Sequence, residues 1–277
     1  MHQVYLNRKW VEETEAFIPL NDGGFLRGDG IFESLLVEEG KVFRLGEHLD
    51  RLLSGLNHIR ITSRESKDEL IDLIREFIRR NRLIDAVIRI IITRGIYESL
   101  PWEEAGSNSI YITSASRPAL PDIPAKIVFL DETRYPIIRR HPAIKSLNYL
   151  GNILAKIDAN DAGAFEPVLY NSDGYITEGG VRNIFFVKDG TLLTPPVSLG
   201  ILPGTMRGAV LDVAEQQGIS SKEILISHTE VDTMDEAFLT STSVKILPVT
   251  WDGWQGKTGV TNRLAEALNM FITKTRE

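Results

Sequence analysis

The sequence contains no cysteine among its 277 residues, which excludes disulfide bonds and thiolate metal sites. It has no apolar run close to the roughly 20 residues that a membrane-spanning helix requires. Its first residues, MHQVYLNRKWV, lack the apolar core of a signal peptide. Acidic residues outnumber basic ones and give a net charge of −7. Nucleic-acid phosphates are bound by clustered positive charge. We therefore expect a cytoplasmic protein whose main partners are neither nucleic acids nor membranes.

The first part of the chain alternates short apolar segments with turns and helical patterns. The hydrophobic fraction of 43% and the charged fraction of 25% are typical of a folded soluble protein. Alternation of apolar and polar residues predicts strands, with Gly40 in a hairpin turn, and leucines spaced three and four apart predict helices. The predicted strands are 4–6, 17–20, 31–37, 41–45, 86–95 and 109–115, and the predicted helices are 45–59 and 66–80.

The segment RPALPDIP, residues 117–124, is the best candidate linker, because its three prolines cannot continue a helix or a central strand. Apolar segments after it predict a second sheet, together with helices over 146–162 and 206–217. Strands and helices mix without a repeating βαβ rhythm, which favours an α+β fold. We expect a small domain over 1–116 and a larger domain over 125–277.

Two segments carry the chemistry: HPAIKSLNYLGNILAK (141–156) and GYITEGGVRNIFF (174–186). The first places Lys145 just ahead of a predicted amphipathic helix, and Lys156 away from its apolar stripe, where we expect it to be solvated. The second places Glu178 in a turn relaxed by glycines that would let a flat ligand approach the backbone. A lysine amine forms a Schiff base with an aldehyde, and a carboxylate pairs with a protonated pyridine nitrogen. Taken alone, each residue is more simply a surface side chain.

Together these segments resemble the fold-type IV pyridoxal-phosphate enzymes, which comprise branched-chain aminotransferases, D-amino acid aminotransferases and aminodeoxychorismate lyases. The segment from Lys145 to Tyr149 matches the family's K-x-x-N-Y/L pattern, and GDGIFE matches its G-D-G-[VI]-[FY]-E strand. The resemblance implies two domains, the larger with a barrel-like mixed sheet, a homodimer, and pyridoxal 5'-phosphate as cofactor. It implies that Lys145 is the Schiff-base lysine and proton shuttle, that Tyr149 contacts the cofactor's phenolic oxygen, and that Glu178 pairs with the pyridine nitrogen.

A phosphate site is expected where LPGTMRG starts a helix, because backbone N–H groups at a helix N-terminus bind anions. The family has G-[IV]-T-R here, so the amides of Thr205 and Met206 are carried over although the usual threonine is displaced by one position. The resemblance further implies a hydroxyl contact from Thr242, in a Ser-Thr-Ser segment, and a charged contact from Arg51 in EHLDRL.

The usual carboxylate-binding residues of the D-amino acid enzymes are missing. Phe32 stands where those enzymes have a tyrosine, and the loop GIYESLPWEEAG has neither arginine nor histidine. Arg27 and Arg182 instead stand where branched-chain enzymes have a tyrosine and a small residue. Each arginine either faces solvent or pairs with a carboxylate such as Asp29, or the two replace the missing site by forming a fork on the substrate carboxylate. The candidate substrate-binding residues are Arg27, Arg182, Phe32, Arg89 and Ser243.

We accordingly expect a transaminase that takes the amino group from D-alanine or D-glutamate and passes it to a 2-oxo acid. The segment GAFEPVLYN also favours the D-amino acid group. Lys145-Ser-Leu-Asn-Tyr149 favours the alternative of a branched-chain L-amino acid transaminase, and a lyase producing 4-aminobenzoate is a third reading. A non-enzymatic binding protein is disfavoured by the intact pair of Lys145 and Glu178. No metal site is expected.

Overall fold

The computed structural model describes residues 2–97, 100, 102, 107–121 and 123–276. Its contacts divide the chain into two compact units. The first unit comprises Met1–Pro118, Ile144–Asn148 and Thr275–Glu277, and the second comprises Ala119–Ala143 and Tyr149–Lys274. The division falls within the proline-rich segment 117–124, and the short segment around Lys145 groups with the first unit although it lies beyond that boundary in the sequence.

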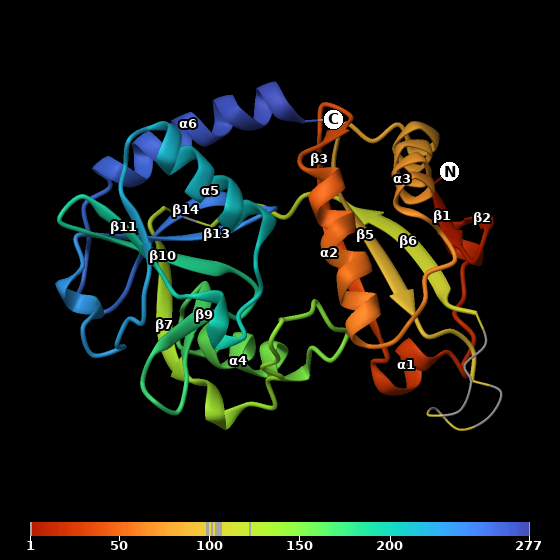
Figure 1. Cartoon of the computed structure of the whole chain (residues 1–277), viewed down its shortest axis with the longest axis horizontal. Helices are drawn as coiled ribbons and strands as arrows, with labels where there is room; N and C mark the ends of the chain where they lie inside the picture. Colours follow the sequence, from red (N-terminus) through yellow and green to blue (C-terminus); the bar gives the residue numbers. More distant parts are fainter. Residues whose placement is uncertain (1, 98–99, 101, 103–106, 122, 277) are drawn as a thin grey trace. The chain divides into compact units, whose positions relative to one another are not determined.

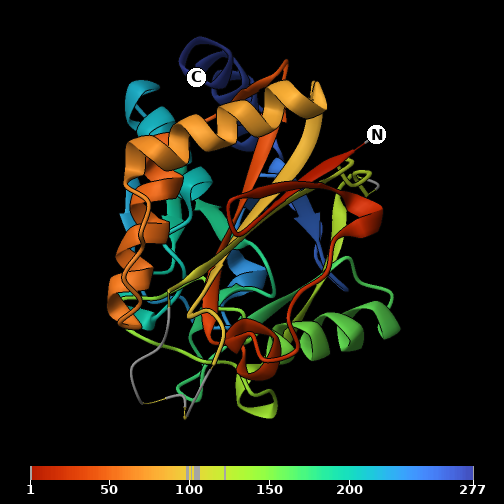
Figure 2. The same cartoon turned by 90° about the vertical axis from the view of Figure 1, so that its right-hand side faces the viewer.

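The first unit is a sheet with two helices on one face. The strand order is β2-β1-β6-β5-β3-β4, and Figures 1 and 2 show α2 and α3 on the same side of this sheet. Apolar side chains from both helices and the facing strands form one buried core. The elements are β1 (Gln3–Leu6), β2 (Lys9–Glu12), α1 (Gly23–Arg27), β3 (Gly30–Glu38), β4 (Lys41–Val42), α2 (Leu45–His58), α3 (Lys67–Asn81), β5 (Asp85–Thr93) and β6 (Ser109–Ala115).

The second unit is built on a mixed, curled sheet that forms a half-barrel, with the strand order β12-β11-β10-β13-β14-β7-β8-β9. An apolar core containing the stacked pair Trp251 and Trp254 fills one face. The elements are β7 (Ala125–Asp131), α4 (Leu150–Asp161), β8 (Glu166–Tyr170), β9 (Ile176–Gly179), β10 (Asn183–Lys188), β11 (Thr191–Thr194), α5 (Thr205–Gln216), β12 (Ser221–Glu223), β13 (Glu236–Ser241), β14 (Lys245–Thr250) and α6 (Gly259–Thr275). Among the described residues, no helix combines the length and apolarity that crossing a bilayer requires.

The structure confirms the α+β fold class and corrects several local predictions. The predicted strand 17–20 is absent, since Phe17 and Leu20 lie exposed in irregular chain that pairs with no strand. The predicted strand 41–45 is reduced to Lys41–Val42, and Arg44 adopts a left-handed conformation before α2. Glu178 lies on strand β9 rather than in a turn. Helix α6 was not predicted, although its buried residues Leu264, Ala267, Leu268 and Ile272 follow helical spacing.

Helix α4 differs most from its prediction. It begins at Leu150 rather than at residue 146, and its buried side consists of small residues, Gly151, Ala155 and Ala159. Gly151 lies so close to Pro136 that an added Cβ would be 2.7 Å from its backbone carbonyl. Of the apolar stripe expected to face the core, Leu150, Leu154 and Ile157 are exposed instead, as is the neighbouring Ile153.

Candidate active site

Lys145 is held against the strand that carries the G-D-G sequence. The N–H of Phe32 donates to the carbonyl of Lys145 at 3.0 Å, and the N–H of Leu147 donates to the carbonyl of Gly30 at 3.0 Å. Segment 145–147 therefore pairs with the N-terminal part of β3, on the side away from β5. These backbone bonds fix the position of Lys145 before any ligand binds.

The Lys145 amine lies against an aromatic ring that a second cation shares. Its Nζ is 4.6 Å from the centroid of the Phe32 ring, and the guanidinium carbon of Arg89 is 5.3 Å from the same centroid. A ring face attracts cations within about 6 Å. Phe32 thus brings together Lys145 and Arg89, two of the predicted site residues.

Arg51 lies mostly buried on α2, paired with a carboxylate, and not in solvent. Its Nε donates to Oε1 of Glu33 at 2.7 Å and its Nη2 donates to Oε2 at 2.8 Å. His48 Nδ1 lies 2.9 Å from Oε2 of the same carboxylate. Burial alone would raise the pKa of Glu33, but Arg51 and His48 outweigh it and lower that pKa to about 2. Burial lowers the pKa of His48, and the nearby charges of Arg51 and Lys145 lower it further, against the opposing effect of Glu33.

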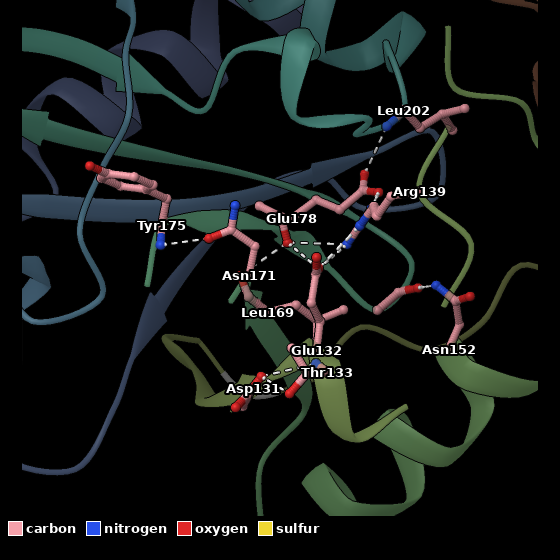
Figure 3. A network of polar contacts seen from close by, with 12 residues as sticks. Asp131, Glu132, Thr133, Arg139, Asn152, Leu169, Asn171, Tyr175, Glu178 and Leu202 are labelled. Atoms are coloured by element: carbon pink, nitrogen blue, oxygen red, sulfur yellow. Dashed lines mark hydrogen bonds and ion pairs between the residues drawn. The ribbon is translucent and has the colours of Figure 1, made fainter. Parts of the chain in front are cut away.

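Glu178, on β9 of the second unit, lies in a polar network that Figure 3 shows. Arg139 Nη1 donates to its Oε1 at 2.5 Å, while Asn183 Nδ2 and the N–H of Leu202 donate to Oε2 at 3.3 and 3.2 Å. Arg139 also donates to Glu132. Burial alone would lower the pKa of Arg139, but the two carboxylates raise it. Sequence reasoning missed Arg139, because it is one of three arginines in the segment RYPIIRRHPAI before Lys145 and no pattern distinguishes it from Arg140.

The start of α5 is connected to the same network. Asn183 Nδ2 donates to the carbonyl of Leu202 at 2.9 Å, and an added Cβ on Gly204 would be 2.2 Å from Asn183 Oδ1. Thr205 and Met206 occupy the first turn with buried side chains. Their position in the first turn is the one at which backbone amides bind a phosphate at a helix N-terminus.

The predicted hydroxyl residues lie in the turn between β13 and β14. Thr242 and Ser243 are half-buried there. The hydroxyls of Ser241 and Ser243 are 3.2 Å apart, within hydrogen-bond distance. The turn thus presents several oxygen donors in a short segment.

Arg182 is mostly buried and forms an ion pair, which was one of the alternatives considered for it, although its partner is Glu166 and not Asp29. Its Nη1 donates to Oε2 of Glu166 at 2.5 Å, and its guanidinium carbon is 4.6 Å from the centroid of the Phe165 ring. Lys156, which we expected to be solvated, is half-buried and donates to the same Glu166 oxygen at 3.3 Å. Among the described residues, the buried Nε of Arg182 has no hydrogen-bond partner.

The glycines after Glu178 have a reason other than ligand access. An added Cβ on Gly179 would be 2.9 Å from a Glu166 oxygen, and one on Gly180 would be 2.9 Å from Pro167. Close packing inside the protein therefore requires both glycines.

Arg27 is exposed at the end of α1, with its guanidinium carbon 5.9 Å from the centroid of the Tyr97 ring. Asp29, the carboxylate considered as its partner, instead accepts hydrogen bonds from Arg94 and from the Tyr97 hydroxyl, both at 2.6 Å. Tyr149 is the N-cap residue of α4. Most of the loop 95–106, in which the usual carboxylate residues are missing, lies outside the described residues.

Comparison with known proteins identifies the family. A family model described as amino-transferase class IV matches residues 30–251. The chain belongs to the class IV aminotransferases.

Individual relatives are named for two different activities. A Methanocaldococcus jannaschii protein, provisionally named a branched-chain-amino-acid aminotransferase, is 39% identical over 89% of this chain and 86% of its own length. A Staphylococcus aureus D-alanine aminotransferase is 33% identical over 98% of both chains. The structure of a branched-chain aminotransferase from Thermoproteus uzoniensis superposes with a TM-score of 0.90, at 28% identity, covering 99% of this chain and 95% of that one.

Class IV aminotransferases use pyridoxal 5'-phosphate, and a similar branched-chain enzyme structure contains pyridoxamine 5'-phosphate. The functional groups of this chain match that cofactor's chemistry. Lys145 offers a positioned amine, Arg51 is held by a buried carboxylate, and Glu178 is a carboxylate joined by a hydrogen bond to the loop before a helix N-terminus. These are the groups that an aldehyde, a phosphate and a pyridine nitrogen require.

Proposed function

We propose that this aminotransferase moves the amino group of a D-amino acid of the D-alanine or D-glutamate class to a 2-oxo acid. The observation that carries the proposal is the incomplete hydrogen bonding of Arg182. Its guanidinium uses one N–H group on Glu166, and its Nε is buried without a partner among the described residues. A guanidinium can hold a carboxylate through two parallel hydrogen bonds, so an unsatisfied one beside the turn that follows Glu178 suits a substrate carboxylate.

Arg27 and Arg89 are the other candidates for contacts with a substrate carboxylate. Arg27 is exposed, and Arg89 extends from the sheet face that carries Phe32. Positive charge on each of these residues would favour a substrate with one or two carboxylates. Ser243 is the remaining candidate contact.

When bound, the cofactor supplies an aldehyde for the substrate amine and an electron-poor ring that stabilises negative charge at the substrate Cα. Lys145 would hold the aldehyde carbon and carry the proton between Cα and C4' of the cofactor. Glu178 would keep the pyridine nitrogen protonated, and Tyr149 would donate a hydrogen bond to the phenolic oxygen. The phosphate would be bound by Arg51, by the amides of Thr205 and Met206, and by the hydroxyl of Thr242.

We further propose that the protein acts as a homodimer in the cytoplasm. Within its unit, α4 exposes an apolar stripe whose first residue, Leu150, is 61% exposed, and contiguous exposed apolar residues are typical of interaction surfaces. A second copy of the chain would cover them. Sedimentation or light scattering at active concentrations should give about twice the monomer mass, and a monomer would contradict the proposal.

A branched-chain L-amino acid transaminase is the second candidate. Tyr149 matches a tyrosine that short branched-chain enzymes carry at this position. The relative with 39% identity is provisionally named for that activity. The preference for D- or L-amino acid substrates depends on which side of the cofactor each arginine occupies.

One side-by-side assay tests the proposal. The purified protein is loaded with cofactor and offered D-alanine, D-glutamate, L-leucine and aminodeoxychorismate, with 2-oxoglutarate and pyruvate as acceptors. We expect the highest kcat/KM with a D-amino acid. Faster turnover of L-leucine would replace the proposal by the second candidate, and release of 4-aminobenzoate would replace it by the lyase.

A further inference from the structure

A carboxylate occupies an apolar position in the core of the first unit. Along β3, Ile31, Glu33 and Leu35 point to the same face, and each is at most 1% exposed. Glu33 pairs across the sheet with Ile90, which is also fully buried. The strand pattern alone would place an aliphatic side chain here, since an unpaired buried charge strongly destabilises a fold.

Two residues of α2 compensate this charge. Arg51 approaches with Nε and Nη2 on separate oxygens of Glu33, at 2.7 and 2.8 Å, which is the fork geometry of a bidentate pair. His48, fully buried one turn earlier on α2, reaches Oε2 at 2.9 Å through Nδ1. The carboxylate is thus in contact with three nitrogens, and the plane of the guanidinium is fixed.

A gain in stability over apolar residues does not explain such a group, because a buried ion pair is often no more stabilising than apolar residues of similar size. Orientation does explain it. An arginine loses side-chain entropy when it binds a ligand, and that loss is smaller when the guanidinium is already held. Arg51 is the one member of the group that the proposed function assigns to the cofactor.

We propose that Glu33 and His48 are positioning residues that hold the Arg51 guanidinium in the orientation in which it binds the cofactor's phosphate. This inference rests on the proposed function, which assigns the phosphate contact to Arg51. Glu33 accepts hydrogen bonds from Nε and Nη2 of Arg51, so the carboxylate sets the orientation of the whole guanidinium.

The test compares two ligands that differ only in the phosphate. The cofactor-free protein is titrated with pyridoxal 5'-phosphate and with pyridoxal. The Kd for pyridoxal divided by the Kd for pyridoxal 5'-phosphate measures how well the phosphate is recognised. Glu33→Gln keeps the shape of the side chain and removes its charge. We expect the ratio to fall roughly tenfold, the lower end of what loss of an outer-shell partner costs a metal site. Affinity for pyridoxal should hardly change.

Two further variants interpret the result. Leu35→Ala, at a buried position on the same face of β3, weakens the core without touching Arg51, so it should leave the ratio unchanged. Arg51→Gln should lower the ratio at least as much as Glu33→Gln. If Glu33→Gln does not fold, Glu33→Asp takes its place, because it keeps the charge but shortens the reach to Arg51.

The outcomes separate the inference from the proposed function. A drop in the ratio for both Arg51→Gln and the Glu33 variant supports the inference. A drop for Arg51→Gln alone, or an equal loss of affinity for both ligands in the Glu33 variant, overturns the positioning role and leaves Arg51 as the phosphate ligand. An unchanged ratio in Arg51→Gln removes Arg51 from the phosphate site, and the inference fails with it.

Discussion

In each unit a fully buried carboxylate is surrounded by basic groups. Glu33 and Glu166 are both 0% exposed, and each is bound by an arginine and a second basic residue. The hydrogen bonding differs. Both oxygens of Glu33 accept from Arg51, whereas Glu166 gives one oxygen to the backbone N–H of Val181 and the other to Arg182 and Lys156.

The two arginines differ in how many hydrogen bonds they make to their carboxylate, and therefore in how many N–H groups could bind a ligand. Arg51 is held by two parallel hydrogen bonds. Arg182 is held by one, and its buried Nε lacks a partner among the described residues. A guanidinium held in a fork is a rigid ligand for one fixed anion, such as a phosphate. One that shares a single hydrogen bond with its carboxylate keeps N–H groups for a second acid, which is the role that we propose for Arg182.

The largest expected effect distinguishes the lysines of the two units. Lys145→Ala should abolish turnover and the visible absorbance band of the bound cofactor while leaving the fold intact, because it removes the proposed Schiff-base amine. Lys156→Ala should keep the band, since Lys156 pairs with Glu166. Absorbance spectra and circular dichroism of both variants check this. Loss of the band in Lys156→Ala alone would reverse the assignment.

Glu178 extends the comparison to a carboxylate that we expect to act on the cofactor directly. Glu178→Gln keeps the hydrogen-bonding shape but removes the charge, so the proton on the pyridine nitrogen is no longer stabilised. Deprotonation of the substrate Cα should slow by roughly 10²–10³-fold, the usual effect of losing one preorganised electrostatic contact. Stopped-flow half-reactions measure this rate, and an unchanged rate would exclude the role.

Arg182→Ala and Arg27→Ala should have similar effects on substrate and different effects on stability. Loss of a bidentate charged contact should lower kcat/KM roughly ten- to a hundredfold for D-alanine and D-glutamate, and little for a simple (R)-amine. Arg182→Ala should also destabilise the fold by about 3 kcal/mol, because it leaves Glu166 buried with one cation fewer. Arg27 is exposed, so Arg27→Ala should change stability by less than about 0.5 kcal/mol.

Steady-state kinetics and urea unfolding separate these effects. Equal losses of activity towards all three substrates would reject the carboxylate role and leave Arg182 as a structural residue.

The ion pair of Glu33 should make the free energy of unfolding depend on pH in the acid range. Its pKa is lowered from about 4.5 to about 2 in the folded state, so its contribution to the free energy of unfolding is present above about pH 4.5 and is lost as pH falls towards about 2. The contribution is roughly 3 kcal/mol, from 1.36 kcal/mol per pKa unit. Glu33→Gln should flatten the acid side of a stability curve measured by urea unfolding. Parallel curves for the variant and the parent would show that Glu33 is not held this way.

The smallest effect is expected at alkaline pH, from the second unit. Burial lowers the pKa of Lys156, and Glu166 only partly opposes it. Between the lowered value and the ordinary value of about 10.5, the unfolded chain binds more protons than the folded one, so stability should rise with pH in that interval. Lys156→Met should remove this rise. Urea unfolding across alkaline pH measures the difference between the two curves, and identical slopes would exclude it.

Much of the fold was predictable because it depends on continuous segments. The helical spacing of leucines predicted α2, and the predicted helix 66–80 begins where Ser66 and Glu69 form a capping box at the start of α3. The strands NIFFVK and AFLTS were recognisable as apolar segments. The strand prediction at 17–20 was wrong because alternation alone does not supply a neighbouring strand.

By itself, the sequence determined the family and hence the cofactor, because motifs such as EHLDRL, GDGIFE and the segments around Lys145 and Glu178 are local and specific. Only the tertiary structure decided which charges meet. Glu33 reaches Arg51 across 18 positions, and Arg139 reaches Glu178 across 39. It also turned the small side of α4 inward, because Pro136 lies against Gly151 and leaves no room for a larger side chain. Such pairings depend on packing between distant segments, which periodicity along one segment does not encode.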